Sequence, residues 1–82
     1  MQEWSDRIAH SLKQPTLKSE ETEELLLLAR EVSHGTGQRA VTPLATFLVG
    51  LAVAETGGTR SAAIRKAHES LRSLIGQEGE RG

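Results

Sequence analysis

The chain has 82 residues, a formal net charge of −1 and no cysteine. This length suits one domain with a modest core, and the absence of cysteine excludes disulfides, thiolate metal sites and thiol chemistry. The longest nearly apolar segment, residues 44–54, is far shorter than the ~20 residues of a membrane-spanning helix, and the first residues lack the basic and apolar pattern of a leader. We therefore expect a cytoplasmic protein without a membrane association.

The first predicted helix covers residues 2–14. Its large apolar side chains, Trp4, Ile8 and Leu12, recur every four residues and therefore share one side of the helix. Pro15 is predicted to end the helix, because proline has no N–H to donate and its ring clashes with the preceding turn. This helix offers one narrow apolar stripe.

The second predicted helix covers residues 19–34. Ser19 is its predicted N-cap, the glutamates that follow suit the positive end of the helix dipole, and Gly35 is its predicted C′ residue. We expect the glutamates of residues 20–24 to form a solvated first turn. Four consecutive leucines, residues 25–28, fan around most of the helix at about 100° per residue, so at least one should meet a second surface.

The third predicted helix covers residues 42–56 and has the clearest start. Thr42 is its predicted N-cap, and Pro43 occupies the first helical position, where its missing N–H costs nothing. Nearly every side chain that follows is apolar or small, which is typical of a helix with neighbours on all sides. We therefore expect this helix at the centre of the fold, with another backbone passing close to Gly50 and Ala54.

The fourth predicted helix covers residues 60–75, behind Thr59. Its apolar side chains lie on one face, and its basic side chains lie largely on the others. The apolar residues are Ile64, Ala67, Leu71, Leu74 and Ile75. Gly76 ends the helix, which gives a single domain over residues 1–76 and a flexible polar tail over residues 77–82. No segment has the period of a strand, so we predict an all-α fold, a compact four-helix bundle around the apolar third helix.

Charge is distributed unevenly along the chain. Acidic residues dominate residues 19–32, whereas basic residues dominate residues 59–75. Such surfaces can pair within the fold, steer a charged partner or maintain solubility, and the last is the commonest case. The surplus leucines of the second helix also favour a homodimer or a fused or bound protein partner.

Histidine is the residue type best suited to acid–base or metal chemistry at neutral pH. The three histidines, His10, His34 and His68, lie on three different predicted helices and have no metal-binding spacing, so no metal site is predicted. We expect His10 and His68 at the surface, and the simplest role of His34 is to bond the last carbonyls of the second helix. Catalytic and phosphate-binding motifs are absent from the sequence, so we predict neither an enzyme nor a cofactor.

A sharper hypothesis places a binding site where the second helix meets the third. Its residues are His34, Arg39, Thr42 and Thr46. The first turn of the third helix presents unpaired N–H groups beside a guanidinium, and together these groups can bind an anion or an acidic partner. Alternatively, Arg39 pairs with Glu31 or caps the carbonyls of the second helix.

A second hypothesis comes from another functional class. Residues 54–67 can be interpreted as a helix-turn-helix whose basic second helix binds DNA. The DNA-binding residues would be Arg60, Ser61, Arg65 and Lys66. The slightly negative net charge argues against nucleic-acid binding, and helix-turn-helix connections occur in any four-helix bundle.

Residues 27–52 carry a family resemblance. They contain Leu-Ala-Arg-Glu-Val-Ser-His-Gly, then Arg39, then Thr-Pro-Leu-Ala-Thr-Phe-Leu-Val-Gly-Leu-Ala. This pattern resembles a small actinobacterial helical domain of unknown function that occurs alone or fused to molybdenum-cofactor guanylyltransferase domains. Ala40 stands where the family pattern has proline. The resemblance implies an accessory role in molybdenum-cofactor maturation, with such a guanylyltransferase as partner. We therefore predict a non-catalytic helical interaction module.

Overall fold

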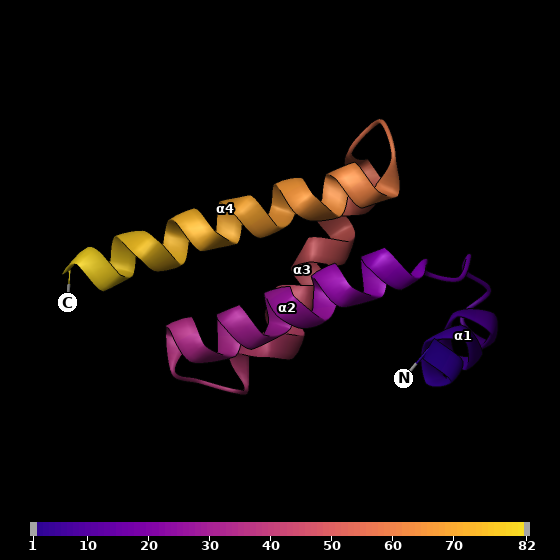
Figure 1. Ribbon diagram of the computed structural model, residues 1–82, viewed down its shortest axis with the longest axis horizontal. Helices are drawn as coiled ribbons and strands as arrows, with labels where there is room; N and C mark the ends of the chain where they lie inside the picture. The colour runs from indigo at the N-terminus through magenta and orange to yellow at the C-terminus, as the bar shows by residue number, and fades with distance from the viewer. Residues whose placement is uncertain (1, 82) are drawn as a thin grey trace.

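A computed structural model describes the backbone of residues 2–81 and the side chains of residues 2–77. Four helices and no strand occur in this part of the chain (Figure 1). The helices are α1 (Gln2–Ser11), α2 (Ser19–Thr36), α3 (Val41–Glu55) and α4 (Arg60–Arg81). The predicted all-α four-helix bundle is confirmed. Among the described helices, none has the length and hydropathy needed to cross a membrane.

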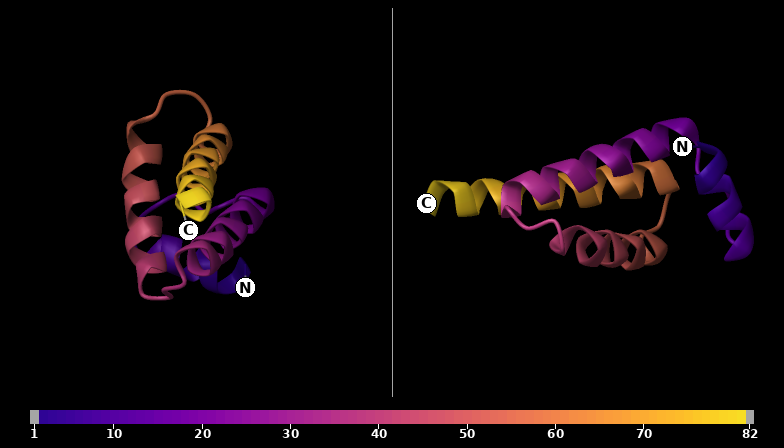
Figure 2. Two further views of the ribbon diagram at one scale, coloured as in Figure 1. Left: turned by 90° about the vertical axis from the view of Figure 1, so that its left-hand side faces the viewer. Right: turned by 90° about the horizontal axis from the view of Figure 1, so that it is seen from below.

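Three of the four helices enclose the core. α2 and α4 pack along each other, and α3 packs against both of them from one side (Figure 2). The buried centre consists of Leu28 and Val32 from α2 and Val49 from α3, with partly buried apolar side chains around it. Outside this group, α1 lies at one end of the molecule, beside the start of α2. The molecule measures 42 × 26 × 18 Å.

Hydrogen bonds join the first residue of α1 to the segment that leads into α2 and to the first turns of α2. Gln2 Nε2 donates to the Leu17 carbonyl (3.0 Å), and Gln2 Oε1 accepts from the Thr22 hydroxyl (3.3 Å). The helix ends at Ser11, three residues earlier than predicted, because Lys13 adopts a left-handed backbone conformation (φ 56°) that a helix cannot contain. The predicted apolar stripe stays exposed: its three residues are Trp4, Ile8 and Leu12.

α2 begins at the predicted residue, Ser19, but the predicted cap residues at its two ends are wrong. Gly35 lies inside the helix, and the left-handed residue that ends it is Gly37 (φ 68°). Gly35 is instead a site of close approach to α4, since a Cβ atom there would meet Ile75 Cδ1 at 3.0 Å. At the other end, the N-cap residue is Lys18 rather than Ser19, and the Lys18 N–H donates to the Glu21 carboxylate (2.7 Å).

The prediction that α3 has neighbours on all sides is wrong. Its residues Val41, Ala45, Val49 and Val53 face the core, whereas the opposite side of the helix is exposed. Among the described residues, no atom of another element lies within 4 Å of a Cβ built on Gly50, so the expected second backbone does not pass there. The helix begins at Val41, and its N-cap Ala40 makes no side-chain bond, so Thr42 is not the cap.

α4 begins as predicted but is longer. The Thr59 hydroxyl accepts from the Ala62 N–H (3.2 Å), which satisfies one of the free donors of the first turn. The helix then continues past Gly76 to Arg81. Side chains of residues 78–82 lie outside the described part, and the flexible tail over residues 77–82 stays a prediction.

Candidate functional site

The outer side of α3 carries a stripe of large apolar side chains. Leu44, Phe47, Leu48 and Leu51 follow the i, i+3, i+4, i+7 spacing that places residues on one side of a helix. Their exposed fractions are 65%, 67%, 61% and 48%. We call these four residues the α3 stripe. Because water contacts each of them, the stripe is a surface that the described chain does not cover.

An apolar groove borders the α3 stripe. It lies between α3 and the later part of α4, has a volume of about 410 Å³, and is lined mainly by aliphatic side chains. Leu44 and Leu48 form one wall, and Leu71 and Leu74 lie on the α4 side. Leu74 is itself 53% exposed, which extends the apolar surface from α3 onto α4.

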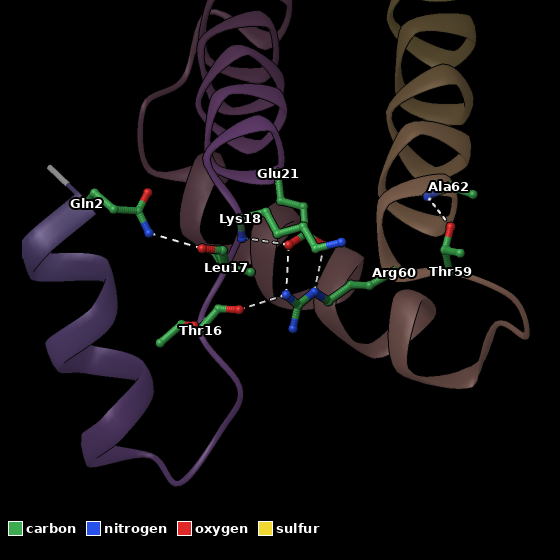
Figure 3. A network of polar contacts seen from close by, with 8 residues as sticks. All are labelled: Gln2, Thr16, Leu17, Lys18, Glu21, Thr59, Arg60 and Ala62. Carbon is green, nitrogen blue, oxygen red and sulfur yellow. Dashed lines mark hydrogen bonds and ion pairs between the residues drawn. The ribbon is translucent and has the colours of Figure 1, made fainter.

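An ion pair between a half-buried arginine and a buried glutamate joins the start of α2 to the start of α4. Arg60 Nε donates to Glu21 Oε2 (2.6 Å), and Arg60 Nη2 donates to Glu21 Oε1 (2.7 Å) and to the Thr16 carbonyl (2.8 Å) (Figure 3). The Glu21 side chain is 2% exposed. Hydrogen bonds from Arg60 lower the pKa of Glu21 to about 2, although burial opposes this shift. The prediction that all glutamates of the first turn are solvated is therefore wrong for Glu21.

A second polar cluster joins the middle of α2 to α4. His68 Nδ1 contacts the Glu24 carboxylate, His68 Nε2 lies 2.8 Å from Glu31 Oε1, and Arg72 donates to both oxygens of Glu31 (2.7 and 3.0 Å). The hydrogen bonds of Arg72, followed by that of His68, lower the pKa of Glu31 to about 2. His68 is 2% exposed, so its predicted surface position is wrong, whereas His10 is exposed as predicted.

These two clusters explain part of the uneven charge of the sequence. Glu21 and Glu31 come from the acidic segment, and Arg60 and Arg72 come from the basic segment. Acidic and basic residues therefore pair within the fold, one of the three outcomes that the charge pattern allowed. In the described part of the chain, no group of three or more metal-ligating side chains is arranged to hold a metal ion.

A comparison with known protein families shows to which family the chain belongs. The family described as "Domain of unknown function (DUF6457)" matches residues 1–82. The chain belongs to this family. Searches of curated proteins and of solved structures found no match. The DUF6457 description names no activity.

In this DUF6457 domain, several polar groups of the predicted anion-binding corner already form hydrogen bonds within the chain. Thr46 donates its hydroxyl hydrogen to the Thr42 and Pro43 carbonyls (3.1 Å each). Two N–H groups at the start of α3 are also used: Val41 donates to the Gln38 carbonyl, and Thr42 donates to the Arg39 carbonyl (3.1 Å each). The remaining residues, His34 and Arg39, are exposed. Binding at this corner stays a prediction.

The residues of the DNA-binding hypothesis have different surroundings in the DUF6457 domain. Arg60 is held by Glu21 and the Thr16 carbonyl, so its guanidinium is already engaged. Arg65 and Lys66 are exposed on α4. DNA binding stays a prediction that rests on these two residues.

Sequence reasoning did not identify the α3 stripe as a surface. Its four residues belong to a helix that is apolar on nearly all sides, a pattern that predicts complete burial. The only available signal was chain length, because an 82-residue domain has few helices with which to surround another helix.

Proposed function

We propose that this DUF6457 domain is a non-catalytic interaction module that docks on another protein chain through the α3 stripe. The observation that supports this proposal is the 48–67% exposure of four large apolar side chains on one side of one helix. Domains that stay alone in water rarely expose contiguous apolar patches of more than a few hundred Å². Docking removes such a patch from water, which is the main favourable contribution to most protein associations.

The polar clusters support a structural role for the titratable residues nearest the core. His68 is 2% exposed and contacts carboxylates through both ring nitrogens. A general acid or base must reach the proton of a substrate, and neither nitrogen is open to one. Glu21 is likewise occupied by Arg60.

The family resemblance supports a place for the module in molybdenum-cofactor maturation. The resemblance of residues 27–52 implies a family whose members occur fused to molybdenum-cofactor guanylyltransferase domains, so we propose such an enzyme as a partner and an accessory role for this chain. The partner would be a separate protein or a fused domain. No cofactor of the module itself is required by this role.

The test is capture of the purified guanylyltransferase by the immobilised chain, in the presence of nuclease. Three chains are compared: the wild type, Leu48→Glu, and Leu12→Glu as a control with similar exposure (61% and 64%) on a different helix. We expect capture by the wild type and by Leu12→Glu, and loss of capture by Leu48→Glu. If the wild type captures nothing, the molybdenum-cofactor role is wrong.

The same experiment separates the remaining possibilities. Capture that survives Leu48→Glu would show that the α3 stripe is not the docking surface. When duplex DNA replaces the enzyme and nuclease is left out, recovery of DNA that requires Arg65 and Lys66 would support the DNA-binding hypothesis instead. Circular dichroism of each variant confirms that the bundle is folded.

A further inference from the structure

We propose that the occupant of the α3 stripe is a second copy of this chain, docked with its α3 antiparallel to the first. The inference rests on the proposed function, because it names the chain that covers the stripe. The guanylyltransferase would then bind the assembled dimer, so a variant that cannot dimerise would also lose capture of the enzyme. It predicts a dimer with twofold symmetry, in which both copies use the same four residues.

The first argument is the order of the residues in the α3 stripe. Leu44 and Leu51 stand at its two ends, and Phe47 and Leu48 stand in the middle. A twofold axis through the middle of the stripe, perpendicular to the helix, places Leu44 of one copy at the level of Leu51 of the other. The same rotation brings Phe47 next to Leu48 of the second copy. Large apolar side chains therefore face one another along the whole stripe.

The second argument is charge complementarity. The chain has no charged residue between Arg39, which precedes α3, and Glu55, at its last position. Both of these residues are exposed, and Glu55 lies two turns beyond Leu48 on the same side of the helix. In the antiparallel arrangement, the end of α3 that Arg39 precedes lies beside the end of the other copy that carries Glu55. The helix dipoles also oppose each other, whereas a parallel arrangement would bring like charges together.

The third argument is the size of the apolar surface. Together with Leu74, the α3 stripe exposes on the order of 500 Å² of apolar side chain per copy. Specific interfaces bury about 800 Å² per partner, including a polar rim. The stripe thus supplies the apolar centre of an interface of ordinary size. The 410 Å³ groove between α3 and α4 can receive an aliphatic side chain of the second copy.

The oligomeric state in solution gives the first test. Sedimentation equilibrium of the full chain should show a concentration-dependent dimer for the wild type and for Leu12→Glu. Leu48→Glu should weaken dimerisation by at least about 100-fold, because each copy would bury an unpaired carboxylate. A wild type that is monomeric at every concentration, or a Leu48→Glu variant that dimerises like the wild type, would overturn the proposal.

Charge reversal tests the antiparallel orientation. Arg39→Glu should weaken the dimer by about threefold to tenfold, since two exposed ion pairs become repulsive. Adding Glu55→Arg to the same chain should restore the dimer, because the two charges are then exchanged at both ends. If the double variant dimerises no more strongly than Arg39→Glu alone, the antiparallel pairing is wrong.

Cysteine cross-linking tests the register, since the natural chain has no cysteine. In the proposed dimer, oxidation should link Leu44→Cys to Leu51→Cys when the two variants are mixed, and neither variant should link efficiently to itself. Efficient self-linking of Leu44→Cys would indicate a parallel dimer and would contradict the proposal.

The outcomes keep the inference and the proposed function separate. A monomeric wild type whose capture of the guanylyltransferase is lost in Leu48→Glu would refute the second copy and leave docking through α3 intact. A dimer lost in Leu48→Glu, with no capture of the enzyme, would support the second copy and refute the molybdenum-cofactor role.

Discussion

Replacing Arg60 with methionine would leave the Glu21 carboxylate buried without its main partner. Hydrogen bonds from Arg60 are the largest cause of the low pKa of Glu21, about 2 instead of the ordinary 4.5. Each tenfold change in proton affinity corresponds to about 1.4 kcal/mol, so the ionised carboxylate is stabilised by about 3 kcal/mol. Arg60 is 34% exposed, and solvent weakens the attraction. We expect Arg60→Met to lower the free energy of unfolding by about 2–3 kcal/mol at pH 7.

The effect has a defined pH dependence. Because the folded-state pKa of Glu21 lies below the unfolded-state pKa, the stabilisation is complete above about pH 4.5 and is lost as the pH falls towards 2. The free energy of unfolding of the wild type should therefore decrease over this range, and the decrease should be smaller in Arg60→Met. The measurement is urea unfolding followed by far-ultraviolet circular dichroism at pH 7 and at pH 3.

The matched control is Arg65→Met, which removes an exposed arginine from the same helix and should change the free energy of unfolding by less than about 0.5 kcal/mol. The double variant Glu21→Leu with Arg60→Met should recover part of the loss, because no unpaired charge is then buried. A loss in Arg60→Met that is no larger than the loss in Arg65→Met would refute the reasoning.

Two further pairs of substitutions test the packing by the same urea assay. Leu28→Ala should cost about 2–5 kcal/mol because its side chain is fully buried, whereas Leu48→Ala, at a concentration where the chain is monomeric, should cost less than about 1 kcal/mol. Equal costs would contradict the observed position of α3. Gly35→Ala should cost about 1–3 kcal/mol because its Cβ would press on Ile75, whereas Gly50→Ala should stabilise by up to about 1 kcal/mol in open space. A Gly35→Ala variant that is as stable as the wild type or more stable would contradict the close contact of α2 with α4.

The sequence predicted where helices begin better than where they end. Thr59 caps α4 because a hydroxyl and a nearby N–H are neighbours in the chain, so the signal is local. Gly35 and Gly76 were interpreted as stop signals, but both lie inside helices. At Gly35 the reason is tertiary: a glycine is needed where Ile75 of another helix approaches, and its spacing in the sequence does not reveal this contact.

The buried polar residues could not be predicted for a related reason. Glutamate and histidine are usually exposed, so the interpretation of Glu21 and His68 as surface residues followed their residue types. Arg60 lies 39 positions from Glu21, and Glu24 lies 44 positions from His68. Ion pairs at such separations follow from the packing of α2 on α4, which no local pattern specifies.

For the α3 stripe, the sequence predicted the apolar residue types but not their exposure to water. The apolar character of α3 and a contact with another chain were both expected from the sequence. However, a helix buried within its own chain and a helix buried against a second chain need the same apolar side chains, so the sequence does not distinguish them. Leu48 therefore looked like a core residue until its 61% exposure was known. The family resemblance is confirmed in part: the chain belongs to a domain family of unknown function. The actinobacterial origin and the fusion to guanylyltransferases stay predictions.

The position of Trp4 determines which spectroscopic signal reports which part of the molecule. Trp4 is the only tryptophan, the chain has no tyrosine, and the side chain is 62% exposed on the terminal helix α1. Helical ellipticity, in contrast, arises mostly from α2, α3 and α4. If α1 separates from α2 at lower urea than the remaining helices melt, fluorescence and ellipticity will give different midpoints without any intermediate in the core itself. Any change in intrinsic fluorescence thus reports on α1, whereas ellipticity reports mainly on the three-helix core.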